Sequence, residues 1–272
     1  MTTLVVTGAG GRMGREVLSV AADRGLAVAG AVNRSAVDDP VAGVAVSEPE
    51  TLPELLADVD GRPVVVDFTA PAATTTYAET AADHDAAFLT GTTGLSETDR
   101  ETLTRAGDRV PVLWASNFSR GVAALRRAVA AAVRAVPGYD VEVTETHHNG
   151  KRDAPSGTAE TLVSEVEAAR PGLEERTHGR EGVAPRSPTE VGVHARRAGD
   201  VSGEHEVLLA GDDNVLELTH RAGSRRVFAA GAVDAAVWLA DRDPGVYAFD
   251  DVLDDRTESA EATTSDPVSD TQ

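Results

Sequence analysis

Short apolar runs alternate with segments of helical periodicity through the first part of the chain. Val17, Leu18, Val20 and Ala21, for example, recur at the spacing of one helix face. Strands that alternate with helices predict a parallel sheet with right-handed crossovers. The expected strands are residues 3–7, 26–32, 63–68, 86–90 and 110–114, and the expected helices include residues 51–58, 72–83 and 96–107.

The pattern changes after residue 119. A helix rich in alanine and valine is expected over residues 120–136, and strand-like alternation begins at Asp140. Several strands joined by turns then predict a second domain with an antiparallel or mixed sheet. Its expected elements are strands 140–146, 190–195, 204–210 and 215–220, a helix from Ser156 to Ala169, and a loop over residues 170–188. An apolar helix is expected over residues 224–240, and residues 255–272 are expected to form a disordered acidic tail.

The composition limits the classes of function. The net charge is -20, and a surface this acidic repels nucleic acid and anionic membranes. We find no membrane-spanning apolar run, no signal-peptide pattern and no cysteine, which together favour a cytoplasmic protein without thiolate metal sites. High acidity with almost no lysine indicates adaptation to a high-salt cytoplasm, where screening tolerates self-repulsion. Chance acidity would leave the loss of lysine unexplained.

A glycine-rich segment follows the first strand directly and leads into a helix. Gly8, Gly11 and Gly14 fit a Gly-x-x-Gly-x-x-Gly pattern, whereas Met13 breaks the Gly-x-Gly-x-x-Gly pattern. Glycines let the backbone turn tightly and approach a pyrophosphate, which then binds at the helix N-terminus. The strand–loop–helix context favours nucleotide binding over an ordinary turn.

The end of the second strand indicates which dinucleotide is bound. In dinucleotide-binding folds this point faces the adenosine ribose, where an acid binds a free 2′-hydroxyl and an arginine accommodates a 2′-phosphate. Asn33 and Arg34 occupy it here, so we expect a preference for NADPH, although an ordinary strand end is the alternative. Ligands bind at the carboxyl ends of parallel strands. We therefore expect one crevice lined by residues 8–13, Thr69, residues 91–93 and residues 115–118.

The densest group of chemically active side chains lies in residues 143–158. His147, His148 and Lys151 stand close together, and a helix is expected to start at Gly157-Thr158. Lys151 is the only lysine of the chain. A lysine's pKa shifts readily on burial, whereas arginine cannot donate a proton near neutral pH. Strand alternation turns adjacent histidines to opposite faces, so we expect no metal shared by this pair.

With these residues, the chain resembles the dihydrodipicolinate reductase family of lysine and diaminopimelate biosynthesis, over about residues 3–253. The motif Glu-x-His-His-x-x-Lys-x-Asp-Ala-Pro-Ser-Gly-Thr at 145–158 is highly specific in order and spacing. The other motifs are Gly-Ala-Gly-Gly-Arg-Met-Gly at 8–14, Asp-Phe-Thr at 67–69, Gly-Thr-Thr-Gly at 91–94, Asn-Phe-Ser at 117–119 and Arg-Ala-Gly-Asp-x-x-Gly-Glu-His at 197–205.

The resemblance implies an α/β fold, with a Rossmann-like doubly wound parallel sheet and an inserted α+β substrate domain that carries a mixed sheet. The dinucleotide-binding domain would comprise residues 1–118 and 224–254, and residues 119–223 would bind substrate and form a homotetramer. The implied reaction is reduction of 4-hydroxy-tetrahydrodipicolinate, a small dicarboxylate, to tetrahydrodipicolinate by hydride transfer from NAD(P)H and protonation. Family members that use NADH well carry an acid where this chain has Asn33, so NADH is expected to be the poorer cofactor.

Position within the motifs also implies the site residues. His147 and Lys151 would be catalytic, and His148, Gly157 and Thr158 would hold the substrate carboxylates. The implied cofactor-binding residues are Gly8, Ala9, Gly10, Gly11, Arg12, Met13, Asn33, Arg34, Gly91, Thr92, Thr93, Ala115, Ser116, Asn117 and Phe118.

The residue types support the same chemistry. A dicarboxylate needs cations and oriented backbone N–H groups, which a helix start at Gly157 supplies. Hydride reduction of a conjugated imine leaves an anion that must take up a proton, and Lys151 can deliver it while His147 relays protons or stabilises charge.

Two alternatives stay open. A different two-domain nicotinamide dehydrogenase, acting on an amino acid or semialdehyde, gives no reason for the His-His-x-x-Lys stretch. A nucleotide-sensing protein would bind NAD(P) without turnover, and would usually carry a DNA-binding module that this acidic chain lacks.

Overall fold

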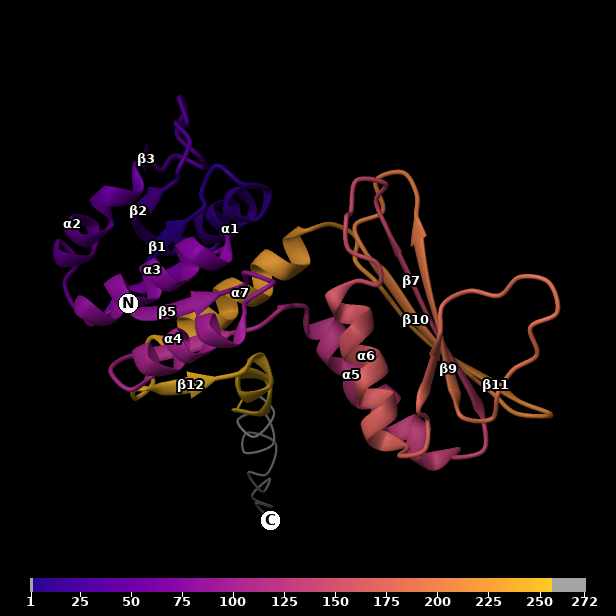
Figure 1. The fold of residues 1–272 in the computed structure, drawn as a ribbon. Coiled ribbons are helices and arrows are strands. Elements are labelled where there is room, and N and C mark those ends of the chain that lie inside the picture. Colours follow the sequence, from indigo (N-terminus) through magenta and orange to yellow (C-terminus); the bar gives the residue numbers. More distant parts are fainter. Residues whose placement is uncertain (1, 256–272) are drawn as a thin grey trace, which may run out of the picture. The chain divides into compact units, whose positions relative to one another are not determined.

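The computed structural model describes residues 2–255 (Figure 1). The tail expected over residues 255–272 therefore lies outside the described residues, except for Asp255. This residue ends a helical segment, residues 249–255, and its carboxylate accepts hydrogen bonds from Trp238 and Arg242, each at 2.8 Å. The expectation of disorder was wrong for Asp255, because a sequence pattern does not show these two distant donors.

The chain divides into two compact units. The first runs up to Phe118 and resumes at Phe228, and the second comprises Ser119–Val227. Within the described part of the chain, no helix is long and apolar enough to cross a membrane.

The first unit is built on a seven-stranded sheet in the order β12-β6-β5-β4-β1-β2-β3. Every pair of neighbouring strands in it is parallel, which confirms the predicted doubly wound sheet. Sequence reasoning missed the short outermost strands β3 and β12. The strands are β1 (Thr3–Thr7), β2 (Ala27–Val32), β3 (Val46–Ser47), β4 (Val64–Asp67), β5 (Ala87–Thr90), β6 (Pro111–Trp114) and β12 (Gly245–Tyr247).

Two apolar layers cover the faces of this sheet. Val6 of β1 packs into one layer and its neighbour Val5 into the other, because successive strand side chains point to opposite faces. Helices α1 and α7 supply the first layer, and α2, α3 and α4 supply the second. In Figure 1, α7 from the C-terminal part of the chain lies among these N-terminal elements. The helices are α1 (Arg12–Asp23), η1 (Pro49–Thr51), α2 (Leu52–Ala57), α3 (Pro71–Asp83), α4 (Glu97–Gly107) and α7 (Arg226–Leu239).

The second unit carries a five-stranded mixed sheet in the order β11-β10-β7-β9-β8, which confirms the predicted mixed sheet. Helices α5 and α6 pack on it through a core that includes Val129, Leu162, Val143 and Val207. The elements are α5 (Arg120–Ala135), β7 (Asp140–His147), α6 (Gly157–Ala169), β8 (Glu175–Thr177), β9 (Glu190–Arg197), β10 (Glu204–Ala210) and β11 (Val215–Arg221).

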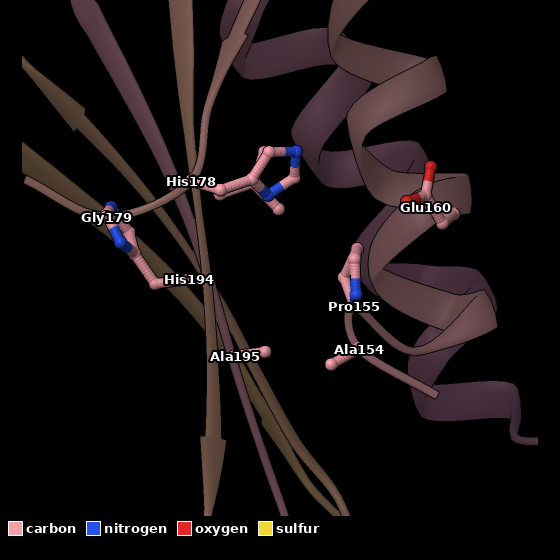
Figure 2. Close-up of a pocket in the computed structure, with 8 residues that line it drawn as sticks. Ala154, Pro155, Glu160, His178, Gly179, His194 and Ala195 are labelled. Carbon is pink, nitrogen blue, oxygen red and sulfur yellow. The ribbon is translucent and has the colours of Figure 1, made fainter. Parts of the chain in front are cut away.

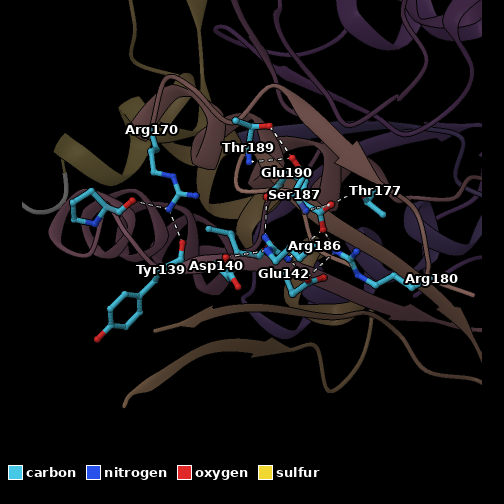
Figure 3. A network of polar contacts seen from close by, with 12 residues as sticks. Tyr139, Asp140, Glu142, Arg170, Thr177, Arg180, Arg186, Ser187, Thr189 and Glu190 are labelled. Atoms are coloured by element: carbon cyan, nitrogen blue, oxygen red, sulfur yellow. Dashed lines mark hydrogen bonds and ion pairs between the residues drawn. The ribbon is translucent and has the colours of Figure 1, made fainter. Parts of the chain in front are cut away.

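The segment expected as a plain loop over residues 170–188 contains β8, and ion pairs between its arginines and glutamates of the sheet hold it in place. Glu190 is buried, and its carboxylate pairs with Arg180 and accepts a hydrogen bond from the Ser187 N–H at 3.0 Å. Arg186 pairs with Glu142 and donates to the backbone oxygen of Glu190 at 2.8 Å (Figure 3). These contacts hold the long connection against β7 and β9.

Candidate active site

The glycine segment between β1 and α1 is shaped by close backbone approach. Gly8 has φ of +74°, and a Cβ there would lie 2.6 Å from the carbonyl oxygen of Phe68. A Cβ on Gly14 would lie 2.2 Å from the carbonyl oxygen of Gly8. Any larger residue at either position would push the loop away from β4 or from α1.

The N-terminus of α1 is suited to an anion. Its N-cap is Gly11, which places no side-chain oxygen on the first N–H groups, and the first turn carries no acidic residue. These N–H groups and the positive end of the helix dipole match a pyrophosphate. The residues present therefore fit a dinucleotide.

Asn33, expected at the adenosine ribose, is also part of the loop scaffold. Its Oδ1 accepts a hydrogen bond from the Gly10 N–H at 3.1 Å, and its Nδ2 donates to the Ser35 carbonyl at 2.7 Å. The side chain therefore ties the glycine segment to the end of β2. The next residue, Arg34, is exposed.

The loops after β4, β5 and β6 are joined through their backbones. The Gly91 N–H donates to the Asp67 carbonyl at 2.9 Å, and the Ala115 N–H donates to the Thr90 carbonyl at 3.2 Å. A Cβ on Gly91 would lie 2.0 Å from the Phe68 ring, so the position of this ring leaves room only for glycine at residue 91. Residues expected to line one crevice thus lie at one edge of the sheet.

The members of this set differ in exposure. Thr93 and Ser116 are exposed, whereas Thr92 is buried. Phe118 is 1% exposed and packs edge-on against Phe68 and Phe249, with ring centroids 6.0 and 5.3 Å away. The Phe118 side chain is thus a core residue beneath the loops, whatever its backbone contacts.

In the second unit, the histidine stretch is organised around Glu145, a residue that sequence reasoning quoted within a motif but gave no role. Its side chain is 0% exposed. Its carboxylate accepts hydrogen bonds from His147 Nδ1 at 2.6 Å, from two Arg197 nitrogens at 2.8 and 2.7 Å, and from the Ser156 N–H at 3.1 Å. Burial opposes ionisation, but the hydrogen bonds and charges of His147 and Arg197 outweigh it and hold the pKa of Glu145 at about 2.

The Glu145 carboxylate also sets the orientation of the His147 ring. An ionised carboxylate can only accept, so Nδ1 carries the proton and Nε2 is left for other partners. That nitrogen lies beside Gly203, where a Cβ would be only 3.1 Å from it. The loop at Gly203 can therefore approach the imidazole closely only without a side chain.

Lys151 lies on the loop after β7, and a backbone hydrogen bond joins this loop to the one between β9 and β10. Its Nζ is 2.8 Å from the Asp153 carboxylate, and its side chain is 21% exposed. Burial opposes ionisation of Asp153, but the hydrogen bond from Lys151 holds the pKa of this carboxyl below its ordinary value. The Asn149 N–H donates to the Gly199 carbonyl at 3.1 Å, which joins the Lys151 loop to the connection between β9 and β10.

Helix α6 begins where the histidine stretch ends. Ser156 is its N-cap, and the Ser156 hydroxyl accepts a hydrogen bond from the Ala159 N–H at 3.2 Å. Gly157 and Thr158 are therefore the first helical residues. Because the Ser156 N–H binds Glu145, the carboxylate that orients His147 also positions this helix start.

His205 is a second residue whose role sequence reasoning missed. It is 2% exposed, its ring centroid lies 5.2 Å from that of His147, and its Nε2 is 3.2 Å from the Ser156 hydroxyl. Burial, reinforced by His147, lowers the pKa of His205 to about 3, so this imidazole is neutral. The only sequence signal was its place at the end of the Arg-Ala-Gly-Asp-x-x-Gly-Glu-His motif.

A pocket of about 530 Å³ lies between β9 and the start of α6 (Figure 2). Neither His147 nor Lys151 lines it, so it is distinct from the predicted catalytic pair. Within residues 2–255, no group of three potential metal ligands is close enough to hold a metal ion. The pocket is lined by Ala154, Pro155, Glu160, His178, Gly179, Val193, His194 and Ala195.

Comparison with known proteins covers both units. The family described as "Dihydrodipicolinate reductase, N-terminus" matches residues 2–118, and "Dihydrodipicolinate reductase, C-terminus" matches residues 121–253. A 4-hydroxy-tetrahydrodipicolinate reductase of Natronomonas pharaonis is 54% identical over 92% of this chain and 99% of that protein. The enzyme of the same name from Haloarcula marismortui is 46% identical over 93% of this chain and 100% of that protein.

A solved structure shares the fold. Dipicolinate-bound dihydrodipicolinate reductase from Paenisporosarcina sp. TG-14 superposes with a TM-score of 0.71 over 91% of this chain and 97% of that chain. The sequence identity is 18%, so this likeness bears on the fold alone.

Proposed function

The chain belongs to the dihydrodipicolinate reductase family, and from that membership we propose that it reduces 4-hydroxy-tetrahydrodipicolinate to tetrahydrodipicolinate in the diaminopimelate route to lysine, with NAD(P)H as the hydride donor and the 4-hydroxyl leaving as water. The observation that supports this most directly is the grouping of Lys151, the Glu145–His147 pair and the start of α6 in one unit. That grouping contains a cation, an oriented imidazole and the positive end of a helix dipole, which suit a reducible dicarboxylate.

We assign the first unit to the dinucleotide. Gly8–Met13 and the start of α1 would hold the pyrophosphate, and Asn33 with Arg34 would face the adenosine ribose. The exposed Arg34 favours a 2′-phosphate, so NADPH is the proposed cofactor and NADH the poorer one. When bound, the reduced nicotinamide supplies a hydride.

We assign the second unit to substrate binding and to assembly of a homotetramer. His148, Gly157 and Thr158 would bind the two substrate carboxylates, since Gly157 and Thr158 lie at the positive end of the α6 helix dipole. Localisation in the cytoplasm is part of the same proposal.

Lys151 would deliver the proton that completes the reduction. Its ammonium is held by Asp153, and a lysine can release a proton where an arginine cannot. His147, with Nδ1 bound to Glu145, would present Nε2 to the substrate region and stabilise or relay charge. Glu145 and Arg197 act through His147 and are positioning residues.

One assay tests the function. NADPH oxidation is followed with enzymatically generated 4-hydroxy-tetrahydrodipicolinate in molar KCl, and product formation should depend on the chain. Reduction of NADP+ by an amino acid, or NADPH oxidation with a semialdehyde, would instead support a different dehydrogenase. NADPH binding with no turnover of any of these substrates would support a sensing protein.

A further inference from the structure

A buried carboxylate, Asp67, stands at the end of β4 and accepts hydrogen bonds from five threonine hydroxyls. Asp67 is 0% exposed. Its Oδ1 accepts from two of them and its Oδ2 from the other three, at 2.6 to 2.9 Å. The donors are Thr7, Thr69, Thr74, Thr90 and Thr92.

The cluster joins three neighbouring strands at the edge where ligands bind. Thr7, Asp67 and Thr90 are the last paired residues of β1, β4 and β5, and they stand side by side in the register of the sheet. Thr69 and Thr92 belong to the loops that follow β4 and β5. In a doubly wound sheet the ligand crevice lies outside these carboxyl ends.

Asp67 decides which way the threonine hydroxyls point. An ionised carboxylate only accepts, so each hydroxyl commits its proton to Asp67 and keeps its lone pairs for other donors. Two backbone groups use those lone pairs. The Thr69 N–H donates to Thr92 Oγ1 at 3.1 Å, and the Thr92 N–H donates to Thr90 Oγ1 at 3.0 Å.

A purely structural role does not require a charge at this point. The preceding residues of β4, Val64, Val65 and Val66, are fully buried and apolar. Replacing a buried ion by apolar side chains is often neutral or stabilising, because its desolvation is costly. A charge retained between two loops of a ligand edge, with every hydroxyl directed at it, indicates control of loop shape.

The strand order indicates which part of the cofactor these loops serve. Asn33 and Arg34, at the end of β2, are assigned to the adenosine ribose, and β2 lies on one side of β1. The strands β4 and β5 lie on the other side of β1. Because a dinucleotide extends across the point where strand order reverses, the β4 and β5 loops correspond to its nicotinamide half.

We propose that Asp67 is a positioning residue of the cofactor site: by orienting the threonine hydroxyls, it holds the loops after β4 and β5 in the shape that receives the nicotinamide half of the dinucleotide. The proposal rests on the proposed function only in taking a nicotinamide dinucleotide as the ligand.

The primary test is the Asp67→Asn variant. The amide keeps the size of the side chain but turns an NH₂ donor toward two or three hydroxyls that were donating. Affinity for NADPH should fall by about tenfold or more, whereas affinity for 2′,5′-ADP, which contains only the adenosine half, should stay within about twofold. Both dissociation constants are measured by titration in molar KCl without turnover. Because these titrations need no turnover, they test the role of Asp67 even if the reductase assay fails.

Two further variants separate positioning from simple loss of stability. Thr92→Val removes the hydroxyl that links Asp67 to the Thr69 N–H, and should reproduce the selective loss of NADPH affinity. Thr74→Val removes another buried hydroxyl, 2.6 Å from the same oxygen but donated by α3. It should lower the melting temperature and leave NADPH affinity within about twofold.

Three results would overturn the proposal. The first is wild-type NADPH affinity in Asp67→Asn, and the second is equal weakening of NADPH and 2′,5′-ADP in Asp67→Asn and Thr92→Val. The third is a loss of NADPH affinity in Thr74→Val as large as in Thr92→Val. If Asp67→Asn does not fold, Thr92→Val alone tests the proposal. Normal NADPH affinity in Thr92→Val would contradict a role for the Asp67–Thr92–Thr69 hydrogen bonds in cofactor binding.

Discussion

At the scale of single residues, two buried carboxylates organise the two candidate sites. The Glu145 carboxylate accepts hydrogen bonds from His147, from Arg197 and from the backbone N–H of Ser156, the N-cap of α6. The Asp67 carboxylate accepts them from threonine hydroxyls. In both cases an acceptor-only group fixes the proton positions of its neighbours. The side chains that would meet ligands are thereby oriented before any ligand arrives, which is how preorganised sites lower the free-energy cost of binding and reaction.

Lys151 gives the sharpest test of the proposed chemistry. Lys151→Arg keeps the positive charge but holds its proton too tightly to act as a general acid. We expect kcat to fall by about two orders of magnitude or more, within the range typical of general acid catalysis, with NADPH affinity nearly unchanged. Steady-state kinetics over a range of pH in high salt measure this. A normal kcat with only a raised KM would make Lys151 a binding residue.

Glu145 should make the stability of the protein depend on acid pH. Its pKa in the folded protein, about 2, lies below the ordinary value of 4.5. Its charged form therefore stabilises the fold above about pH 4.5, and this contribution is lost as the pH falls from there toward 2. Glu145→Gln should flatten the stability profile in that window. Urea unfolding midpoints across pH 2–6 measure it.

A matched control is Glu167→Gln in the same unit, because Glu167 pairs with Arg176 at a partly exposed position. Its effect on the same profile should be small, since solvent screens such a pair. Equal flattening by both variants would contradict a special role for Glu145.

Arg34 should determine the choice of cofactor. A hydrogen bond to a charged group contributes about 1.5–3 kcal/mol, so Arg34→Ala should erase much of the preference for NADPH over NADH. The measurement is kcat/KM with each cofactor for both proteins. Equal kcat/KM for NADPH and NADH in the unmodified protein would refute the assignment.

At the scale of elements, the second unit depends on how its long connection between α6 and β9 is held. Sequence reasoning treated residues 170–188 as a loop rich in glycine, proline and arginine. In the structure its arginines Arg180 and Arg186 meet Glu190 and Glu142 on the sheet, and β8 adds a parallel strand to β9. A polar segment is thus ordered by charges that lie far from it in sequence.

Glu190 is the residue on which that ordering depends most. Glu190→Gln keeps the size but removes the charge of a buried carboxylate that pairs with the more exposed Arg180, which should lower the free energy of unfolding by about 1.5–3 kcal/mol. Glu167→Gln serves again as the control and should cost about 0–1 kcal/mol. Chemical denaturation in molar KCl measures both. Equal small effects would show that the connection is ordered mainly by backbone pairing.

At the scale of the whole molecule, charge is the dominant property. The net charge is -20, so the many acidic side chains repel one another. At low ionic strength the Debye length grows, and this repulsion then acts between more distant charges.

We expect loss of structure or activity on dialysis to low salt, with recovery as molar KCl is restored. Circular dichroism and the reductase assay, recorded along one salt titration, measure this. Full stability in dilute buffer would contradict the high-salt interpretation and leave the loss of lysine without a physical reason.

Several features were determined by the sequence alone, because they are local. The continuous apolar run of β1 marks a strand that is buried on both faces, and the helix spacing at Val17 and Leu18 marks one buried helix face. The parallel sheet follows from the order of such strands and helices. The glycine segment and the His147–Lys151 stretch were found because each is continuous in sequence. Short outer strands such as Val46–Ser47 were missed, since two residues carry no periodicity and are ordered only by pairing with β2.

Only the tertiary structure decided which groups share protons and charges. Glu145 lies 52 positions from Arg197, His205 lies 49 from Ser156, and Asp67 lies 60 from Thr7. Hydrogen bonds need partners within about 3 Å, and no sequence pattern reports which distant side chains reach that distance. A buried carboxylate must find its donors through packing, because leaving it without them costs more than the fold can offset. The chemistry of the candidate sites was therefore visible in the sequence as residue types, and the structure alone decided how those residues are held.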